Sequence, residues 1–453
     1  MAFALWFGSA QIGFPEDTLL RLSQAEAPIL DPVPEADRTR PERDDEDAAP
    51  RALESEPIAP VLEQKAADDL PANVRGNRTE RKWRIIPFGR FRTIFDDNIF
   101  ISHDNPESDV SFTVSPGIAA GWGDYGAEVR QLGEFEHYFE PLNLTYEDTP
   151  QSFAFAKYVA NASLFLDHSD ESALDHDALV AGRWESKKLS LGLRVHYQTL
   201  SGTDIDVGDR VKRQVITGFI TSSYKLSEKT SIDLNILNST YDYETGVDWD
   251  EWTLETWLAY QILPKTRVSI GSRAGITDIQ GGQTETFEQV VGRVTYYASS
   301  KLALSLDGGI EWRQYGGDGH DDVFSVFNFA ATYAPFDGTT ISVNAFRKNA
   351  ASASLINENI TNTGVNVRTR QRFLHRYFLT LEGGYSNSEY RSILTGTAGG
   401  REDNTVYVKP AVSFDITKNL SAESAYQFQK NDSTVETYSF VENLITFQLN
   451  LQF

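Results

Sequence analysis

The sequence predicts an all-β protein, a transmembrane antiparallel up-and-down β-barrel of about 18 strands that follows a disordered N-terminal extension. From Trp83 onward, apolar and polar residues alternate with a period of two, which is typical of strands with one apolar face. The connections between these segments are alternately short and long, as in barrels that cross a membrane. The last segment, LITFQLNLQF, alternates throughout and ends on Phe453.

The composition limits the class of protein. The chain has 453 residues, a formal net charge of -24 and no cysteine, so disulfides and thiolate metal sites are excluded. Its acidity makes nucleic acid an unfavourable partner. The mean hydropathy is -0.38, and we find no apolar run of about eighteen residues that would form a spanning helix.

Two segments precede the predicted barrel. Residues 1–10 have the apolar stretch and small residues of a signal peptide but no basic start, so we expect a signal-peptide remnant or, as the alternative, a sticky terminus. Residues 11–82 are rich in Pro, Ala, Glu, Asp and Arg and nearly lack aromatics. This composition predicts a disordered, acidic periplasmic linker; a short amphipathic helix or a docking segment is the alternative.

Residues 83–453 are expected to form the barrel. In KLSLGLRVHYQTL, for example, the leucines share one parity while Arg194, His196 and Gln198 share the other. The short connections include LPKT, SSK and TKN, and the long ones include GTDIDVGDR, YETGVDWD, GGQTET and LTGTAGGRED. Short turns at one rim and long loops at the other are typical of outer-membrane barrels, where the short turns are periplasmic.

The alternation predicts eighteen strands, with sixteen as the second choice because residues 126–160 could hold one strand or three. An even count places both ends of the barrel at the periplasmic rim. The expected strands are 86–95, 109–121, 143–156, 177–185, 189–200, 211–226, 231–243, 250–262, 267–280, 287–298, 302–315, 322–335, 340–350, 360–373, 377–390, 404–416, 420–432 and 439–453.

The chain resembles a known family at FDDNIF (residues 95–100) and SDVSFTVSPGI (108–118), and in EWRQY, PFDGTTIS and RQRFL further along. These segments are similar to the β-barrel porin type 2 group of outer-membrane proteins and to barrel proteins of Verrucomicrobia-like bacteria. The resemblance implies a barrel with no assigned substrate or catalytic residues, and an association of some relatives with exopolysaccharide loci. The terminal Phe453 resembles the signal read by the barrel-insertion machinery.

The inward-facing cations are the most informative polar residues. A midplane arginine turned to lipid costs roughly 2–4 kcal/mol, so these side chains are expected to point into the barrel and line a pore. They are Arg90, Arg92, Arg183, Arg194, Arg267, Arg273, Arg293, Arg313, Arg368, Arg370, Arg372 and Lys409. The inward acids are Glu311 and Glu382, with Glu185, Asp233, Glu255, Asp307, Asp415 and Glu423. Salt bridges that only brace the wall are an equally weighted interpretation.

The sequence gives no reason to expect an enzyme, a cofactor or a specific metal. The seven histidines lie in no motif that matches barrel proteases, phospholipases or deacylases. Two oxygen-rich segments, 167–177 and 316–322, fit no EF-hand spacing, so we expect them to be solvated loops rather than calcium sites.

The sequence therefore favours an outer-membrane channel for polar solutes or an exopolysaccharide. The alternative is a plugged barrel that displays adhesive or structural loops. The expected partners are outer-membrane lipid, lipopolysaccharide, the insertion machinery and, in the periplasm, polysaccharide export proteins. A barrel of 16–18 strands is wide enough to hold water unless loops fill it.

Limited proteolysis is expected to remove residues 11–82 and leave a folded core that starts near Trp83, because the linker carries little apolar surface to bury. Mass spectrometry of the core and its heat-modifiable mobility on gels test this. A barrel that unfolds on trimming would show instead that the segment braces or fills the lumen.

Overall fold

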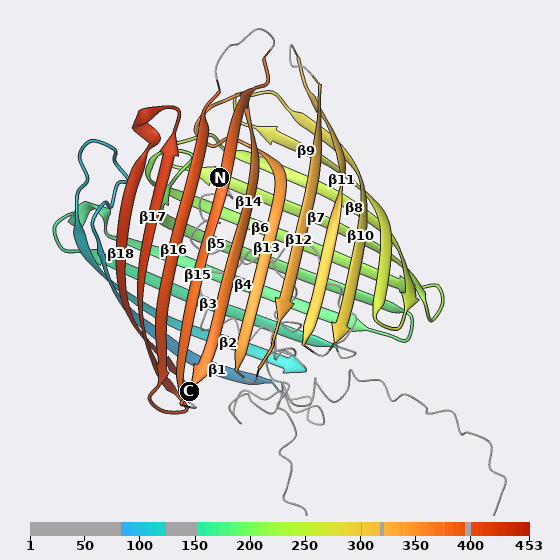
Figure 1. Ribbon diagram of the computed structural model, residues 1–453, viewed down its shortest axis with the longest axis horizontal. Helices are drawn as coiled ribbons and strands as arrows, with labels where there is room; N and C mark the ends of the chain where they lie inside the picture. The colour runs from blue at the N-terminus through green and yellow to red at the C-terminus, as the bar shows by residue number, and fades with distance from the viewer. Residues whose placement is uncertain are drawn as a thin grey trace, which may run out of the picture.

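All eighteen strands of the computed structural model belong to one closed antiparallel sheet (Figure 1). The structure describes residues 83–123, 152–299, 301–317, 321–336, 338–374, 376–394 and 400–453, so the predicted signal remnant and linker lie outside it. Each strand pairs with its neighbours in sequence, and β1 pairs with β18 to close the ring. The strands are β1 Arg84–Asp96, β2 Asp109–Gly123, β3 Phe153–Phe165, β4 Ala173–Glu185, β5 Leu189–Asp204, β6 Asp209–Lys225, β7 Thr230–Tyr243, β8 Trp249–Leu263, β9 Thr266–Ile279, β10 Glu285–Ser299, β11 Leu302–Tyr315, β12 Asp322–Tyr333, β13 Thr339–Ala351, β14 Glu358–Phe373, β15 Tyr377–Ser392, β16 Glu402–Asp415, β17 Leu420–Ser433 and β18 Phe440–Gln452.

The predicted barrel and its count of eighteen strands are confirmed, and the count of sixteen is wrong. The third strand was misplaced, because it runs over Phe153–Phe165 rather than 143–156, of which 143–151 lie outside the described residues. In this strand, alanines occupy much of the outer face, and Phe153, Phe155 and Val159 are buried on the inner face. Apolar residues therefore occupy both faces, with Lys157 among those on the inner face, and the alternation that marks the other strands is weak.

The connections differ between the two rims. At the terminal rim, where β1 begins and β18 ends, most turns are short, and residues 264–265 alone separate β8 from β9. The exception is the connection of β2 to β3, which spans residues 124–152. At the opposite loop rim, residues 97–108 connect β1 to β2, and residues 244–248 connect β7 to β8. One predicted long loop is wrong, since GTDIDVGDR is mostly strand and only residues 205–208 separate β5 from β6.

The wall has two chemically distinct faces. On β5, Leu191, Leu193 and Val195 point outward with 39–50% of their surface exposed, whereas Arg194 and His196 between and beside them are 5% and 3% exposed. The other strands repeat this pattern, so large aliphatic and aromatic side chains cover the outer wall. Such a surface suits lipid on the outside and polar groups on the inside.

Among the described residues, no helix is long and apolar enough to cross a membrane. Two three-residue 3-10 turns, Ser169–Glu171 and Glu436–Tyr438, are the helical elements in that part of the chain.

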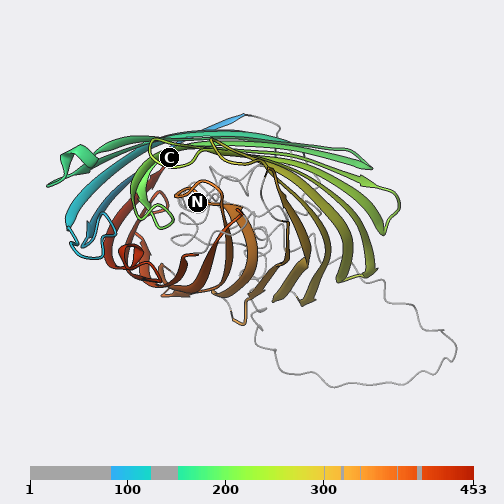
Figure 2. The same cartoon turned by 90° about the horizontal axis from the view of Figure 1, so that it is seen from above.

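The barrel is flattened in cross-section, with the strands drawn in green on one broad side and those in orange on the other (Figure 2). Strand β5 is eight positions from β13 in the ring of eighteen, so these two strands lie on nearly opposite sides. As a result, loops from opposite walls can meet across the loop rim.

Phe453 lies at the seam that closes the sheet. Its side chain is 59% exposed on the outer face, and its backbone N–H donates to the carbonyl of Pro87 in β1 at 3.1 Å. Deleting Phe453 is expected to lower the amount of folded barrel in the outer membrane, because the seam loses a hydrogen bond and an aromatic side chain on its outer face. Heat-modifiable gel mobility of membrane fractions measures this, and Phe453→Tyr is the matched control. Barrels that do insert should conduct normally; undiminished insertion of the deletion would contradict the expectation.

Candidate functional site: the inner wall of the barrel

The twelve cations predicted to line a pore, together with Glu311 and Glu382, lie on the inner face of the wall. Most of them are well buried between neighbouring strands; Arg183 and Arg194 are each 5% exposed, and Arg313 and Glu311 are each 1% exposed. Arg92, Arg273, Lys409 and the three arginines of β14 are partly exposed towards the interior. The structure thus brings these inward-facing residues together on one surface.

Ion pairs connect several of these arginines across strands β8 to β11. Arg273 pairs with Glu255 and with Asp307, the latter at 3.2 Å. Arg313 lies between Glu285 at 2.7 Å and Glu311 at 2.8 Å. Removing one partner of such a buried pair leaves an uncompensated charge, which costs several kcal/mol. In this part of the wall the arginines therefore serve as braces.

Sequence reasoning missed Glu285, because it belongs to GGQTET, which was interpreted as loop. In the structure it is the first residue of β10 and is fully buried. The alternation does extend to it, since Glu285, Phe287 and Gln289 share one parity. That parity is the signal that could have placed Glu285 on the inner face.

A second buried charge cluster joins β3, β4 and β5. Asp177 accepts from Lys157 and from His196, with O···N distances of 3.2 and 3.0 Å. The sequence placed His196 on the inner face, put Asp177 where the oxygen-rich segment 167–177 meets the predicted strand 177–185, and did not select Lys157. Strand β4 in fact begins at Ala173, which carries Asp177 into the wall.

The three arginines of β14 form a ladder with a different environment. Arg368 Nε lies 3.8 Å from Glu382 Oε2, and Arg370 lies over the ring of Phe378 at 4.5 Å. Tyr407 also donates to Glu382, at 3.1 Å. One carboxylate thus meets both Arg368 and a phenol, while Arg370 contacts an aromatic face.

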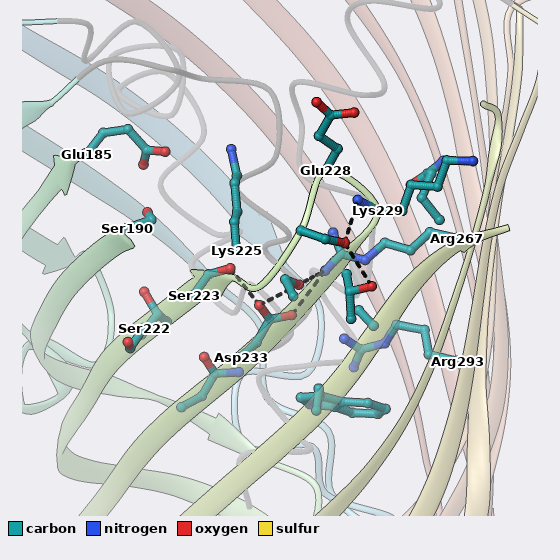
Figure 3. Close-up of a pocket in the computed structure, with 18 of the residues that line it drawn as sticks. Glu185, Ser190, Ser222, Ser223, Lys225, Glu228, Lys229, Asp233, Arg267 and Arg293 are labelled. Atoms are coloured by element: carbon teal, nitrogen blue, oxygen red, sulfur yellow. Dashed lines mark hydrogen bonds and ion pairs between the residues drawn. The ribbon is translucent and has the colours of Figure 1, made fainter. Parts of the chain in front are cut away.

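Two cavities open along the inner wall. The larger is about 450 Å³ and is lined by residues of β1 to β7 and β16 to β18, including Arg90, Arg92 and Lys409. The smaller is about 120 Å³ and lies near the terminal rim against strands β4 to β10, including Arg267 and Arg293 (Figure 3). Both combine charged side chains with hydroxyl groups, so they suit polar solutes.

A bridge crosses the loop rim. Asp206, in the turn between β5 and β6, accepts from the N–H of Ala353 at 2.6 Å and from the hydroxyls of Ser352 and Ser354 at 3.1 and 2.8 Å. Arg401 donates to the Asp206 carboxylate at 3.3 Å and to its carbonyl at 3.0 Å. Because Asp206 is only 2% exposed, these bonds form a dry contact between opposite walls.

Apolar residues support the bridge on the inside. Tyr241 and Trp249 stack at 4.2 Å between ring centroids and belong to a buried cluster with Val211, Ile279 and Ala353. No pattern in the sequence indicated this cluster, since its members come from five separate segments. The opening at the loop rim is therefore narrower than it would be if the loops pointed outward.

A histidine clamp joins two neighbouring loops at the same rim. His168, between β3 and β4, has Nε2 2.8 Å from Glu107 and Nδ1 3.0 Å from Asp109. The hydrogen bond to Glu107 and then that to Asp109 raise the pKa of His168 above its ordinary value. Below that raised pKa the imidazolium stabilises the loop pair, and the contribution is lost as the pH rises through it.

The oxygen-rich segments were considered for calcium. Among the described residues, no group of three or more His, Asp or Glu side chains has an arrangement that could hold a metal ion. Part of the second segment, residues 318–320, lies outside those residues.

Comparisons with known proteins give a likeness of low score. No family model matches the chain, and no curated protein matches it. Solved structures that align with 82% of the chain include Pseudomonas aeruginosa OpdK with vanillate (TM-score 0.41, 8% identity, 99% of that chain). Others are P. aeruginosa OccK2 with glucuronate (0.43, 11%, 98%) and Acinetobacter baumannii OccAB3 (0.42, 12%, 99%). The resemblance to the β-barrel porin type 2 group therefore stays a prediction, and the function below is argued from the wall itself.

Replacing Asp206 with alanine is expected to release the bridge, because each charge-assisted hydrogen bond that it accepts contributes roughly 1.5–3 kcal/mol. Amide hydrogen exchange should accelerate in residues 205–208 and 352–357 while the strands stay protected. Asp209→Ala is the control on the same hairpin, since Asp209 is exposed and bonds only locally, to the N–H of Arg210 at 2.7 Å. Equal exchange in both variants would show that Asp206 does not hold the two loops together.

Proposed function

We propose that this protein is a bacterial outer-membrane channel for small polar solutes, with a preference for anions. The observation that carries the proposal is the two-faced, closed wall: aliphatic and aromatic side chains outside, and arginines, carboxylates, amides and hydroxyls inside. If packed side chains alone filled the interior of the barrel, buried charges would add nothing to its stability, because charges are costly to desolvate. Polar linings around a wide barrel are the design of water-filled channels.

The preference for anions is inferred from three cations that lie close together on one face of β14. Arg273 and Arg313 each meet two carboxylates, so they contribute little net field. The ladder of Arg368, Arg370 and Arg372 has Glu382 as its closest acid in the register of β14 and β15. Its residues lie at i, i+2 and i+4, roughly 7 Å apart, so their potentials overlap within a Debye length.

The orientation in the membrane follows from the rims. Short turns mark the periplasmic side in outer-membrane barrels, so the terminal rim is assigned to the periplasm and the loop rim to the outside. The N-terminal tail would then be periplasmic. Outer-membrane lipid, lipopolysaccharide and the insertion machinery are the partners that this placement implies.

The bridge at Asp206 affects the size of the solute that the channel would admit. A contact that joins opposite walls divides the loop-rim opening, which favours small solutes over an exopolysaccharide chain. The same bridge favours a second candidate function, a plugged barrel that displays loops. Planar-bilayer recordings separate the two, since a channel gives discrete conductance steps and a plugged barrel gives none.

The ladder is tested by ion selectivity. In a salt gradient, the reversal potential of the wild type is expected to show anion preference, and the variant with Arg368, Arg370 and Arg372 all changed to Gln should lose most of it. Lys430→Gln is the control, because Lys430 is half-exposed on β17 and pairs with Asp432 at 2.8 Å. A cation-selective wild type, or unchanged selectivity in the triple variant, would show that the ladder only braces the wall.

A further inference from the structure

The smaller cavity has the features of a binding site. It lies on the inner wall near the terminal rim, where Arg267 and Arg293 both point into it (Figure 3). We propose that these two guanidinium groups hold a small oxyanion, a carboxylate or a phosphate, at this point of the channel. The proposal rests on the proposed function, because a solute must reach the inner wall to bind there.

Arg293 supplies the strongest reason. It lies on β10, is 8% exposed, and its guanidinium stacks on the indole of Trp257 at 3.9 Å. Its Nε and Nη2 atoms are buried and meet no hydrogen-bond acceptor among the described residues. Buried donors are normally satisfied, and leaving one without an acceptor costs about 1–3 kcal/mol, more for a charged group. An oxyanion in the cavity would supply the acceptor.

Trp257 fixes the orientation of this guanidinium. A planar guanidinium stacked on an aromatic face keeps its N–H groups in the plane of the stack, directed to the sides. The N–H groups of Arg293 are thus preorganised towards the cavity, with little side-chain entropy left to lose on binding. A carboxylate or phosphate can accept two such parallel hydrogen bonds.

Arg267 is positioned by a separate set of contacts. Its Nη2 atom donates to the hydroxyl of Ser231 at 2.7 Å and to Asp233 at 3.2 Å. Asp233 also accepts from the hydroxyls of Ser223 and Ser231, at 2.6 and 3.1 Å. The carboxylate is therefore shared among three donors, and it holds Arg267 at the cavity wall without reaching Arg293 in any of these bonds.

The charge of the lining favours an anion. Among the described residues, five basic and three acidic side chains line the cavity. Two of the acids are engaged by neighbouring arginines, since Glu185 pairs with Arg183 at 2.9 Å and Asp233 with Arg267 at 3.2 Å. Of the remaining bases, Lys225 and Lys229 line the cavity together with Glu228, and Arg293 lies opposite Asp307 in the register of β10 and β11.

The volume sets the size of the ligand. About 120 Å³ is slightly less than the roughly 150 Å³ of a core cavity that accepts benzene. A dicarboxylate of four carbons or inorganic phosphate fits this space, and an oligosaccharide does not. The site would hold a solute transiently as it passes, provided that binding is weak enough for release.

Equilibrium binding to the full-length, detergent-solubilised barrel tests the proposal. Succinate and inorganic phosphate are titrated separately by calorimetry, with chloride at matched ionic strength as the reference. The wild type is expected to bind at least one of the two, and the pair of titrations shows whether the carboxylate or the phosphate is preferred. Arg293→Gln should weaken binding at least tenfold, and Arg293→Lys should weaken it too, because lysine cannot make the forked contact.

Arg391→Gln is the matched control, since it removes one arginine that is exposed near the loop rim and pairs with Glu389. It should bind like the wild type. Heat-modifiable mobility of each variant confirms that the barrel is folded. No binding by the wild type, or equal affinities for wild type and folded Arg293→Gln, would overturn the site.

Conductance of the same preparations keeps the two proposals apart. Discrete conductance steps without oxyanion binding would contradict the proposed binding site and would support the proposed channel. Binding that depends on Arg293 in a barrel that gives no conductance would contradict the proposed channel and would support the proposed binding site.

Discussion

The whole structure depends on the pairing of β1 with β18. Nine residue pairs, from Phe88 with Gln452 to Asp96 with Leu444, join the two ends of the sheet. An open edge would expose backbone N–H and C=O groups to hydrocarbon, where each unsatisfied group costs several kcal/mol. Once the ring is closed, every strand has a lipid face and an interior face. The parity of a position in the strand then decides on which of the two faces its side chain lies.

Closure also explains why so many charged residues lie inside. Arginines cannot face lipid cheaply, so they turn inward, and once inside they need acids, amides or aromatic faces as partners. Arg313 shows the result: it contacts Glu285 and Glu311, which in turn accept from Asn359 and Asn349 at 3.3 and 3.0 Å. The two asparagines come from β14 and β13, so this network links strands beyond the nearest neighbours.

Much of this arrangement could be predicted from the alternation of apolar and polar residues along the strands. The period of two placed the inward arginines, the eighteen strands and the two kinds of rim, because each depends only on residues close in sequence. It failed at β3, where apolar residues occupy both faces, and at Glu285, where a strand begins inside a loop-like composition. It could not indicate the Asp206 bridge, whose partners are 146 to 195 positions away, or the unsatisfied donors of Arg293, which depend on side-chain geometry.

The bridge at Asp206 has a mechanical consequence. A closed sheet resists stretching along its hydrogen bonds but can change its cross-section by bending between strands. A tie between the β5–β6 turn and the loops that follow β13 and β15 fixes the short diameter of the flattened ring at one end. Among the described residues, lateral pressure from the surrounding bilayer is then carried by this strut at the loop rim and by the wall itself at the terminal rim. The two ends of the barrel should therefore differ in stiffness, with the wider fluctuations at the end that carries the short turns.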